Sequence, residues 1–146
     1  MTRFWTRSGA LIAVVDSGPL YAAVDADDDD HQRCSEVLLR SDLRLVIPAL
    51  VVAEVTYLIG RRLGAAIESR FLAGLEGLNI QAPYPEDWVR IAGLVEQYAD
   101  FPLGGTDASV IAATERMGTD LVLTLDRRHF HTVRPRHCEH LLLLPE

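Results

Sequence analysis

The sequence contains no lysine, since all 14 of its lysine-or-arginine positions are arginines. Receiver domains and haloacid dehalogenase phosphatases also place an aspartate at the end of a strand, but both use a lysine. The dehalogenase pattern further needs a second aspartate where Gly18 stands. The phosphate-holding loops GxGxxG and GxxxxGK are absent as well. These absences argue against four common functions of α/β proteins.

Cysteine and long apolar runs are also scarce. Cys34 and Cys138 match no zinc spacing and are too few for a disulfide framework, which favours a reducing compartment. No apolar stretch approaches the roughly 20 residues that cross a bilayer, and the N-terminus lacks the cleavage pattern of a signal peptide. We therefore expect a cytoplasmic protein with no membrane association.

The length of 146 residues, 49% of them hydrophobic, suits a single domain over residues 1–146. Residues 1–10 would then be an extension that is either disordered or added by a mispredicted start. Apolar runs typical of strands cover residues 11–16, 43–47, 78–83, 119–126 and 139–146. Helical patterns begin near residue 30 and cover residues 49–64, 65–77, 86–100 and 106–118. This alternation predicts a three-layer α/β/α sandwich with a mainly parallel sheet of four to five strands.

Several local expectations accompany this outline. Gly18 should be a break that lets the chain leave the first strand, and residues 127–137 should form a polar loop. The helix over 49–64 should be mostly buried. In the helix after Pro85, the spacing of apolar residues places Trp88 and Tyr98 on the core face. The next helix should be capped by Thr106 or Asp107.

Two aspartates follow apolar strands directly, Asp16 in VVDSGPL and Asp126 in LVLTLDRRHF. In parallel sheets, ligands bind beyond the carboxyl ends of strands, near the point where the strand order reverses. Either residue could instead serve only as a turn or cap. Each is therefore a candidate site residue whose case depends on its neighbours.

Two further acids strengthen that case. Glu54 is the one charged residue within ALVVAEVTYLI, and a buried carboxylate is costly unless it is paired or bound to a metal. It could also reach solvent or pair with Arg61 or Arg62. Asp107 begins the helix TDASVIAATER, where capping alone would explain it. If the four acids converge, their repulsion calls for a cation, and oxygen ligands select Mg²⁺ or Mn²⁺.

The motifs VVDSGPL, AEVTYL, LGGTDASVIAA and LVLTLDRRHF, in this order, resemble a PIN-domain ribonuclease of the VapC toxin type. The resemblance covers nearly the whole chain from residue 11. It implies that Asp16, Glu54, Asp107 and Asp126 are the catalytic, metal-binding acids. Ser17 and Thr106 stand where such proteins often have a hydroxyl near the metal or phosphate.

The resemblance further implies a Mg²⁺- or Mn²⁺-dependent endoribonuclease that cuts structured RNA of the tRNA or rRNA class. It implies a homodimer, held inactive by a VapB-like antitoxin that inserts a basic side chain into the acidic pocket. The alternative is a PIN-like RNA-binding or protein-interaction module without catalysis. The presence of all four acids disfavours that alternative.

A net charge of −7 argues against broad binding to nucleic acid. A bound metal and the basic segment after Asp126 could still hold RNA, because arginine binds phosphate and stacks on unpaired bases. The segment could equally be a solvated loop. The run Asp27 to Asp30 is expected to be a solvated turn and helix cap rather than a metal site. The candidate RNA contacts are Arg127, Arg128, Arg134 and Arg136, beside His129, His131 and His137.

Overall fold

The computed structural model describes residues 10–146 of the chain. Within them, the strands are β1 (Leu11–Val15), β2 (Leu43–Pro48), β3 (Ile80–Gln81), β4 (Leu121–Leu123) and β5 (Leu142–Leu144). The helices are α1 (Ser17–Val24), α2 (His31–Leu38), α3 (Ala49–Leu63), α4 (Ala65–Gly74), α5 (Asp87–Gln97), α6 (Gly105–Met117) and α7 (Arg127–Thr132), with a 3₁₀ turn at Leu75–Gly77. The expected N-terminal extension falls on residues 1–9, outside the described residues, and on residue 10.

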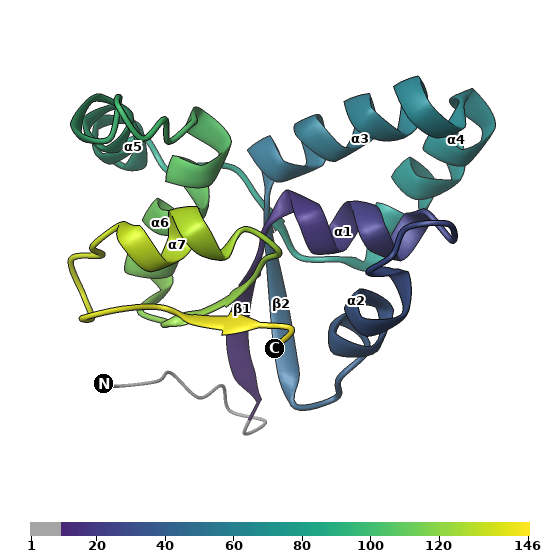
Figure 1. The fold of residues 1–146 in the computed structure, drawn as a ribbon, viewed down its shortest axis with the longest axis horizontal. Helices are drawn as coiled ribbons and strands as arrows, with labels where there is room; N and C mark the ends of the chain where they lie inside the picture. Colours follow the sequence, from purple (N-terminus) through teal and green to yellow (C-terminus); the bar gives the residue numbers. More distant parts are fainter. Residues whose placement is uncertain (1–9) are drawn as a thin grey trace.

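The five strands form one parallel sheet in the order β3-β2-β1-β4-β5. Helices α1 to α4 lie on one side of this sheet and α5 to α7 on the other (Figure 1). The predicted three-layer α/β/α architecture is therefore confirmed. None of the helices in residues 10–146 combines the length and apolar character that crossing a bilayer requires.

Strand β1 is the centre of the sheet and of the core. Ala13, Val14 and Val15 are fully buried, as expected for a parallel strand that is covered on both faces. Its neighbours are β2 on one side and β4 on the other, so the strand order reverses beside β1. The carboxyl ends of β1 and β4 are consequently adjacent, at the position where α/β sheets bind ligands.

The chain leaves β1 before Gly18, as expected, but it continues directly into a helix that the sequence did not predict. Helix α1 begins at Ser17, directly after Asp16. A Cβ atom placed on Gly18 would lie 3.2 Å from Cβ of Leu125, a tight contact that glycine avoids where α1 passes close to the segment after β4. The sequence pattern showed the glycine but not the tertiary neighbour that explains it.

The polar loop expected over residues 127–137 is also wrong in its first half, which forms α7. The Asp126 side chain accepts a 3.0 Å hydrogen bond from the backbone N–H of His129 and so caps this helix. Phe130 is completely buried and anchors α7 to the core. A single apolar residue in a polar segment was too weak a signal to predict the helix.

Two helices bury less than the sequence predicted. Helix α3 buries only Val51, Val55 and Ile59, because it packs through one face in an outer layer. In α5 the core face is made by Ile91 and Leu94, while Trp88 is 50% exposed. Tyr98, just beyond this helix, is partly buried against the core as expected. Helix α6 begins earlier than predicted and is capped by Gly104, which leaves Thr106 and Asp107 in its first turn.

Candidate active site

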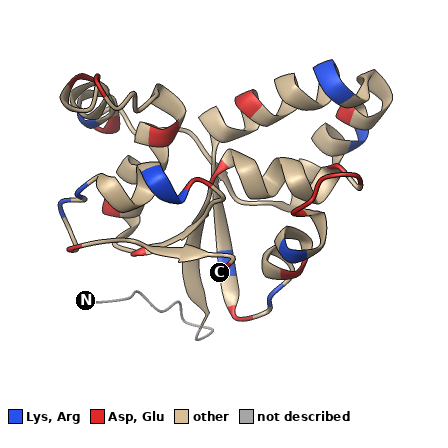
Figure 2. Ribbon diagram, in the orientation of Figure 1, with Lys and Arg blue, Asp and Glu red and all other residues tan. Residues whose placement is uncertain are grey.

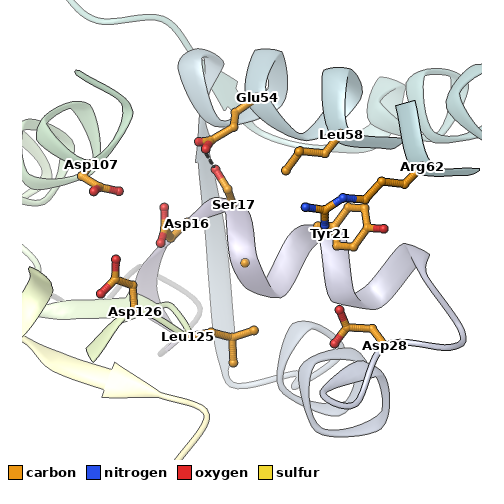
Figure 3. Close-up of a pocket in the computed structure, with 11 residues that line it drawn as sticks. Asp16, Ser17, Tyr21, Asp28, Glu54, Leu58, Arg62, Asp107, Leu125 and Asp126 are labelled. Carbon is orange, nitrogen blue, oxygen red and sulfur yellow. Dashed lines mark hydrogen bonds between the residues drawn. The ribbon is translucent and has the colours of Figure 1, made fainter. Parts of the chain in front are cut away.

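A pocket of about 560 Å³ lies at the carboxyl edge of β1 and β4, between α1, α3, α6 and the start of α7 (Figure 3). All four acids selected from the sequence line it, although they come from four separate segments. In the ribbon view, acidic positions surround the same end of the sheet (Figure 2). The four lining acids are Asp16, Glu54, Asp107 and Asp126.

Asp16 is the most buried of the four, at 5% exposure. Its backbone N–H donates to the carbonyl of Leu123 at 2.8 Å, which continues the pairing of β1 with β4. Its carboxylate accepts a 2.8 Å hydrogen bond from Thr124 Oγ1, and the same hydroxyl accepts from the backbone N–H of Asp126 at 2.9 Å. Thr124, which the sequence analysis overlooked, therefore sets the positions of two acids at once.

Glu54 lies on the solvent-exposed side of α3, not in the buried setting on which its selection relied. Ser17 Oγ donates a 2.7 Å hydrogen bond to its carboxylate from the first turn of α1 (Figure 3). Neither Arg61 nor Arg62 forms an ion pair with Glu54 in the part of the chain that the structure describes. The alternative of an arginine partner is thus wrong, whereas the Ser17 hydroxyl does touch an acid of the pocket.

The carboxylates of Asp16, Asp107 and Asp126 point toward one another across the pocket (Figure 3). His129 stands beside two of them, because its Nδ1 bonds the Asp126 carboxylate and lies 4.0 Å from that of Asp107. Its ring meets Phe101 edge-on, with 4.8 Å between the ring centroids. His129 was grouped with the basic RNA-contacting segment, but its ring faces the acids.

The electrostatics of the pocket reflect this crowding. Burial, with smaller contributions from Asp107 and Glu54, raises the pKa of Asp16 from 3.8 to about 7. Burial likewise raises the pKa of Asp107 to about 6; His129 opposes this shift, while Asp126 and Glu54 add to it. The hydrogen bond to Asp126 raises the pKa of His129. Proteins that keep several carboxylates this close commonly neutralise them with a cation.

The residues present fit a hard divalent cation. Donor atoms of Asp107, Asp126 and His129 lie within 4.8 Å of one another, and the His129 Nε2 is buried without a hydrogen-bond partner within residues 10–146. Asp16 and Glu54 add further carboxylate oxygens to the lining of the same pocket. A set dominated by carboxylates suits Mg²⁺ or Mn²⁺ rather than a thiolate-bound metal.

The remaining candidates lie outside the lining of this pocket in the described chain. Thr106 is next to Asp107, and its carbonyl accepts a 2.6 Å hydrogen bond from Ser109 Oγ. Arg127 donates to the carbonyl of Pro145 at 2.7 Å, and the Arg128 guanidinium lies 5.3 Å from the centroid of the Phe101 ring. All four arginines proposed to contact RNA are exposed, on α7 or on the segment that follows it.

The sequence of the chain also matches a known protein family. A sequence profile of the PIN domain matches residues 13–134, which include all four acids. The chain belongs to the PIN domain family. This membership confirms the resemblance deduced from the four motifs.

Within the PIN family, the chain is 37% identical over 127 residues to Ribonuclease VapC26 of Mycobacterium tuberculosis, covering 84% of this chain and 92% of that protein. Its fold is similar to that of M. tuberculosis VapC20, a toxin that cleaves the sarcin-ricin loop (TM-score 0.70, 16% identity, 75% of this chain and 86% of that one). It is also similar to VapBC2 from Rickettsia felis bound to promoter DNA (TM-score 0.65, 16% identity, 90% and 96%). These likenesses place the chain among PIN domains of the VapC type.

Proposed function

We propose that the protein is a metal-dependent endoribonuclease that acts in the cytoplasm as the toxin of a toxin-antitoxin pair. The observation that carries this proposal is the meeting of Asp16, Glu54, Asp107 and Asp126 in one pocket with no arginine paired to them among the described residues. The relationship to a VapC ribonuclease supports RNA as the substrate. Structured RNA of the tRNA or rRNA class is the proposed target.

The four acids would hold Mg²⁺ or Mn²⁺, and hydrogen bonds orient three of them for that task. Thr124 orients Asp16, Ser17 orients Glu54, and the N–H and ring of His129 orient Asp126. Held by these residues, a divalent cation would supply the charge that activates a water and stabilises the leaving oxygen of a phosphodiester. Asp16 and Asp126 follow strands, Asp107 lies in the first turn of α6 and Glu54 lies within α3, so regular elements of the fold keep the carboxylates in place.

The proposed partners follow from charge and exposed apolar surface. A pocket lined by five acids and one arginine suits a basic side chain inserted by a VapB-like antitoxin. On α5, Trp88 and Val89 are 50% and 79% exposed, which favours burial against a second copy in a homodimer. The structural similarity to proteins solved as toxin-antitoxin complexes supports the antitoxin partner.

The decisive experiment compares Asp16→Asn with Glu76→Gln. Glu76 is a suitable control because it is an exposed acid that does not line the pocket. We expect Asp16→Asn to reduce cleavage of cellular RNA at least a hundredfold, because it removes one ligand charge and leaves the Thr124 bond intact. EDTA should do the same to the wild type, and Mn²⁺ or Mg²⁺ should restore cleavage. Glu76→Gln should behave as wild type. RNA cleavage that survives both EDTA and Asp16→Asn would refute the proposal.

A further inference from the structure

The pocket has two chemically different ends. Glu54, Leu58 and Arg62 follow one another at four-residue spacing on α3, so they share one face of that helix, and all three line the pocket. Eight helical residues correspond to about 12 Å, so Arg62 stands well away from the acidic end. Figure 3 shows the guanidinium extending over Tyr21, on the side opposite Asp107 and Asp126.

Arg62 is oriented by an aromatic ring rather than by a carboxylate. Its Cζ lies 5.2 Å from the centroid of the Tyr21 ring, a cation–π arrangement. Tyr21 is itself fixed, because it is buried and its hydroxyl donates a 2.7 Å hydrogen bond to Asp25. Arg62 therefore rests on a rigid support from α1.

The charge of Arg62 remains available to a ligand. Within residues 10–146, no carboxylate lies at salt-bridge distance from its guanidinium, in contrast to Arg90 and Arg116. Asp28 also lines this end of the pocket, but one of its oxygens accepts the backbone N–H of Asp30 at 2.8 Å. Arg62 is thus the one cationic side chain among the residues that line the pocket.

We propose that Arg62 binds a phosphate of the RNA strand on a nucleotide next to the one that is cut. This inference rests on the proposed function. For a strand that places one phosphate among the acids, where a cation would neutralise it, the pocket continues along α1 and α3, where Tyr21, Leu58 and Arg62 line it. The planar guanidinium of Arg62 presents several N–H donors that match the oxygens of a phosphate. Because the Tyr21 ring already restricts the Arg62 side chain, less of its conformational entropy is lost when a phosphate binds. Arg62 is accordingly a substrate-positioning residue rather than a catalytic one.

Arg61 provides a matched control on the same helix. It is an exposed arginine whose guanidinium donates to the Tyr57 hydroxyl at 3.3 Å, and it does not line the pocket. Arg62→Ala and Arg61→Ala therefore remove the same charge from adjacent positions. Only the first removes it from the pocket. Arg62→Lys keeps the charge but loses the planar fork.

The test measures binding of a labelled single-stranded oligouridylate, with Ca²⁺ in place of Mg²⁺ and the intactness of the RNA checked by electrophoresis. We expect Arg62→Ala to weaken binding about tenfold, and Arg61→Ala to leave it near wild type. The slope of log affinity against log salt should shrink by about 0.7 for Arg62→Ala, because one phosphate contact is lost. Arg62→Lys should recover the slope. In cleavage assays, Arg62→Ala should raise KM more than it lowers kcat.

The outcomes separate this inference from the proposed function. Equal affinity, salt slope and KM for Arg62→Ala and Arg61→Ala, with a wild type that cleaves RNA, would overturn the role of Arg62 alone. So would a variant that binds RNA normally and loses only the complex with a protein partner, because Arg62 would then recognise an acidic side chain. A wild type that neither binds nor cleaves RNA would instead overturn the proposed function. Thermal unfolding of each variant shows whether the loss of the Tyr21 contact has altered the fold.

Discussion

The protein shields carboxylates from solvent in two regions, but it gives them arginine partners in only one of the two. Where α5 packs on α6, the Arg90 guanidinium forms a bidentate salt bridge with the Glu115 carboxylate, with both N–O distances at 2.9 Å. Beside it, Arg116 Nε lies 2.8 Å from Oδ2 of Asp87. In the pocket, Asp16 and Asp107 meet other acids instead. In the first region, arginines of the chain neutralise the carboxylates. In the second region, the negative charge is neutralised only when a cation binds.

The pKa values express this difference. Burial alone would raise the pKa of Glu115, but hydrogen bonds from Arg90 and from the backbone of Arg136 hold it below its ordinary value. Asp16 also accepts hydrogen bonds, from Thr124 and the backbone of Ser17, but neither Asp16 nor Asp107 has a guanidinium partner, and burial raises the pKa of both. Burial therefore has opposite net results in the two regions, and the cationic partner of Glu115 distinguishes them. Unpaired acids that are retained at a cost in stability are a common sign of a functional site.

The largest expected effect is on the pH dependence of stability. Asp16 has a pKa of about 7 in the folded protein and about 3.8 when unfolded, so the folded state holds more protons between these values. Without metal, the free energy of unfolding should therefore fall as pH rises from 4 to 8, by about 4 kcal/mol through Asp16. Denaturant titrations of wild type and Asp16→Asn in EDTA would measure this difference. Saturating Mg²⁺ should reduce the decline, and identical pH profiles for the two proteins would contradict the assignment.

Breaking the paired region should cost stability. Arg90→Ala leaves Glu115 without its guanidinium partner in a site where the side chains are only 12–15% exposed. We expect the free energy of unfolding to fall by about 2 kcal/mol at pH 7, measured by chemical denaturation. The same variant should retain its affinity for Mn²⁺, since Arg90 is remote from the pocket lining. Unchanged stability would mean that solvent replaces the pair without loss.

Removing a support of the pocket should weaken metal binding. Ser17→Ala deletes the hydrogen bond to Glu54, and we expect Mn²⁺ to bind about tenfold more weakly by calorimetry. Thr56→Ala is the matched control. Thr56 lies on α3, as Glu54 does, and the substitution deletes a 2.7 Å hydrogen bond from its hydroxyl to the carboxylate of Glu68 on α4, outside the pocket. Equal metal affinity in the two variants would show that the Ser17 hydroxyl does not contribute to metal binding.

The smallest effect should have the opposite sign to that of Arg90→Ala. Asp107→Asn relieves repulsion in the pocket, so the metal-free protein should gain about 1 kcal/mol at pH 7 while losing RNA cleavage. Thermal unfolding in EDTA measures the gain, and an RNA cleavage assay measures the loss. A destabilised Asp107→Asn protein would show that this carboxylate stabilises the fold and would undo the contrast between the two regions.

Much of this organisation was predictable because it depends on local patterns. The uninterrupted apolar run before Asp16 indicates a strand buried on both faces, and such strands alternate with amphipathic helices in α/β sheets. Glu54 was selected by its position among apolar residues, although the reason was wrong: the structure exposes it, and Ser17 holds it. A helical pattern gives the angle between residues but not which side another element will cover, and the same ambiguity led to the misplacement of Trp88.

By itself, the sequence determined the class of fold, the strand-end aspartates and the family, since these follow from hydrophobic periodicity and from motifs a few residues long. Only the tertiary structure decided which groups meet. Thr124 holds Asp16 across 108 positions, His129 turns toward the acids, and Arg62 lies on Tyr21 at the far end of the same pocket. The physical reason is that a parallel sheet gathers distant strand ends at one edge, and side-chain partners there depend on how α1, α3 and α7 pack.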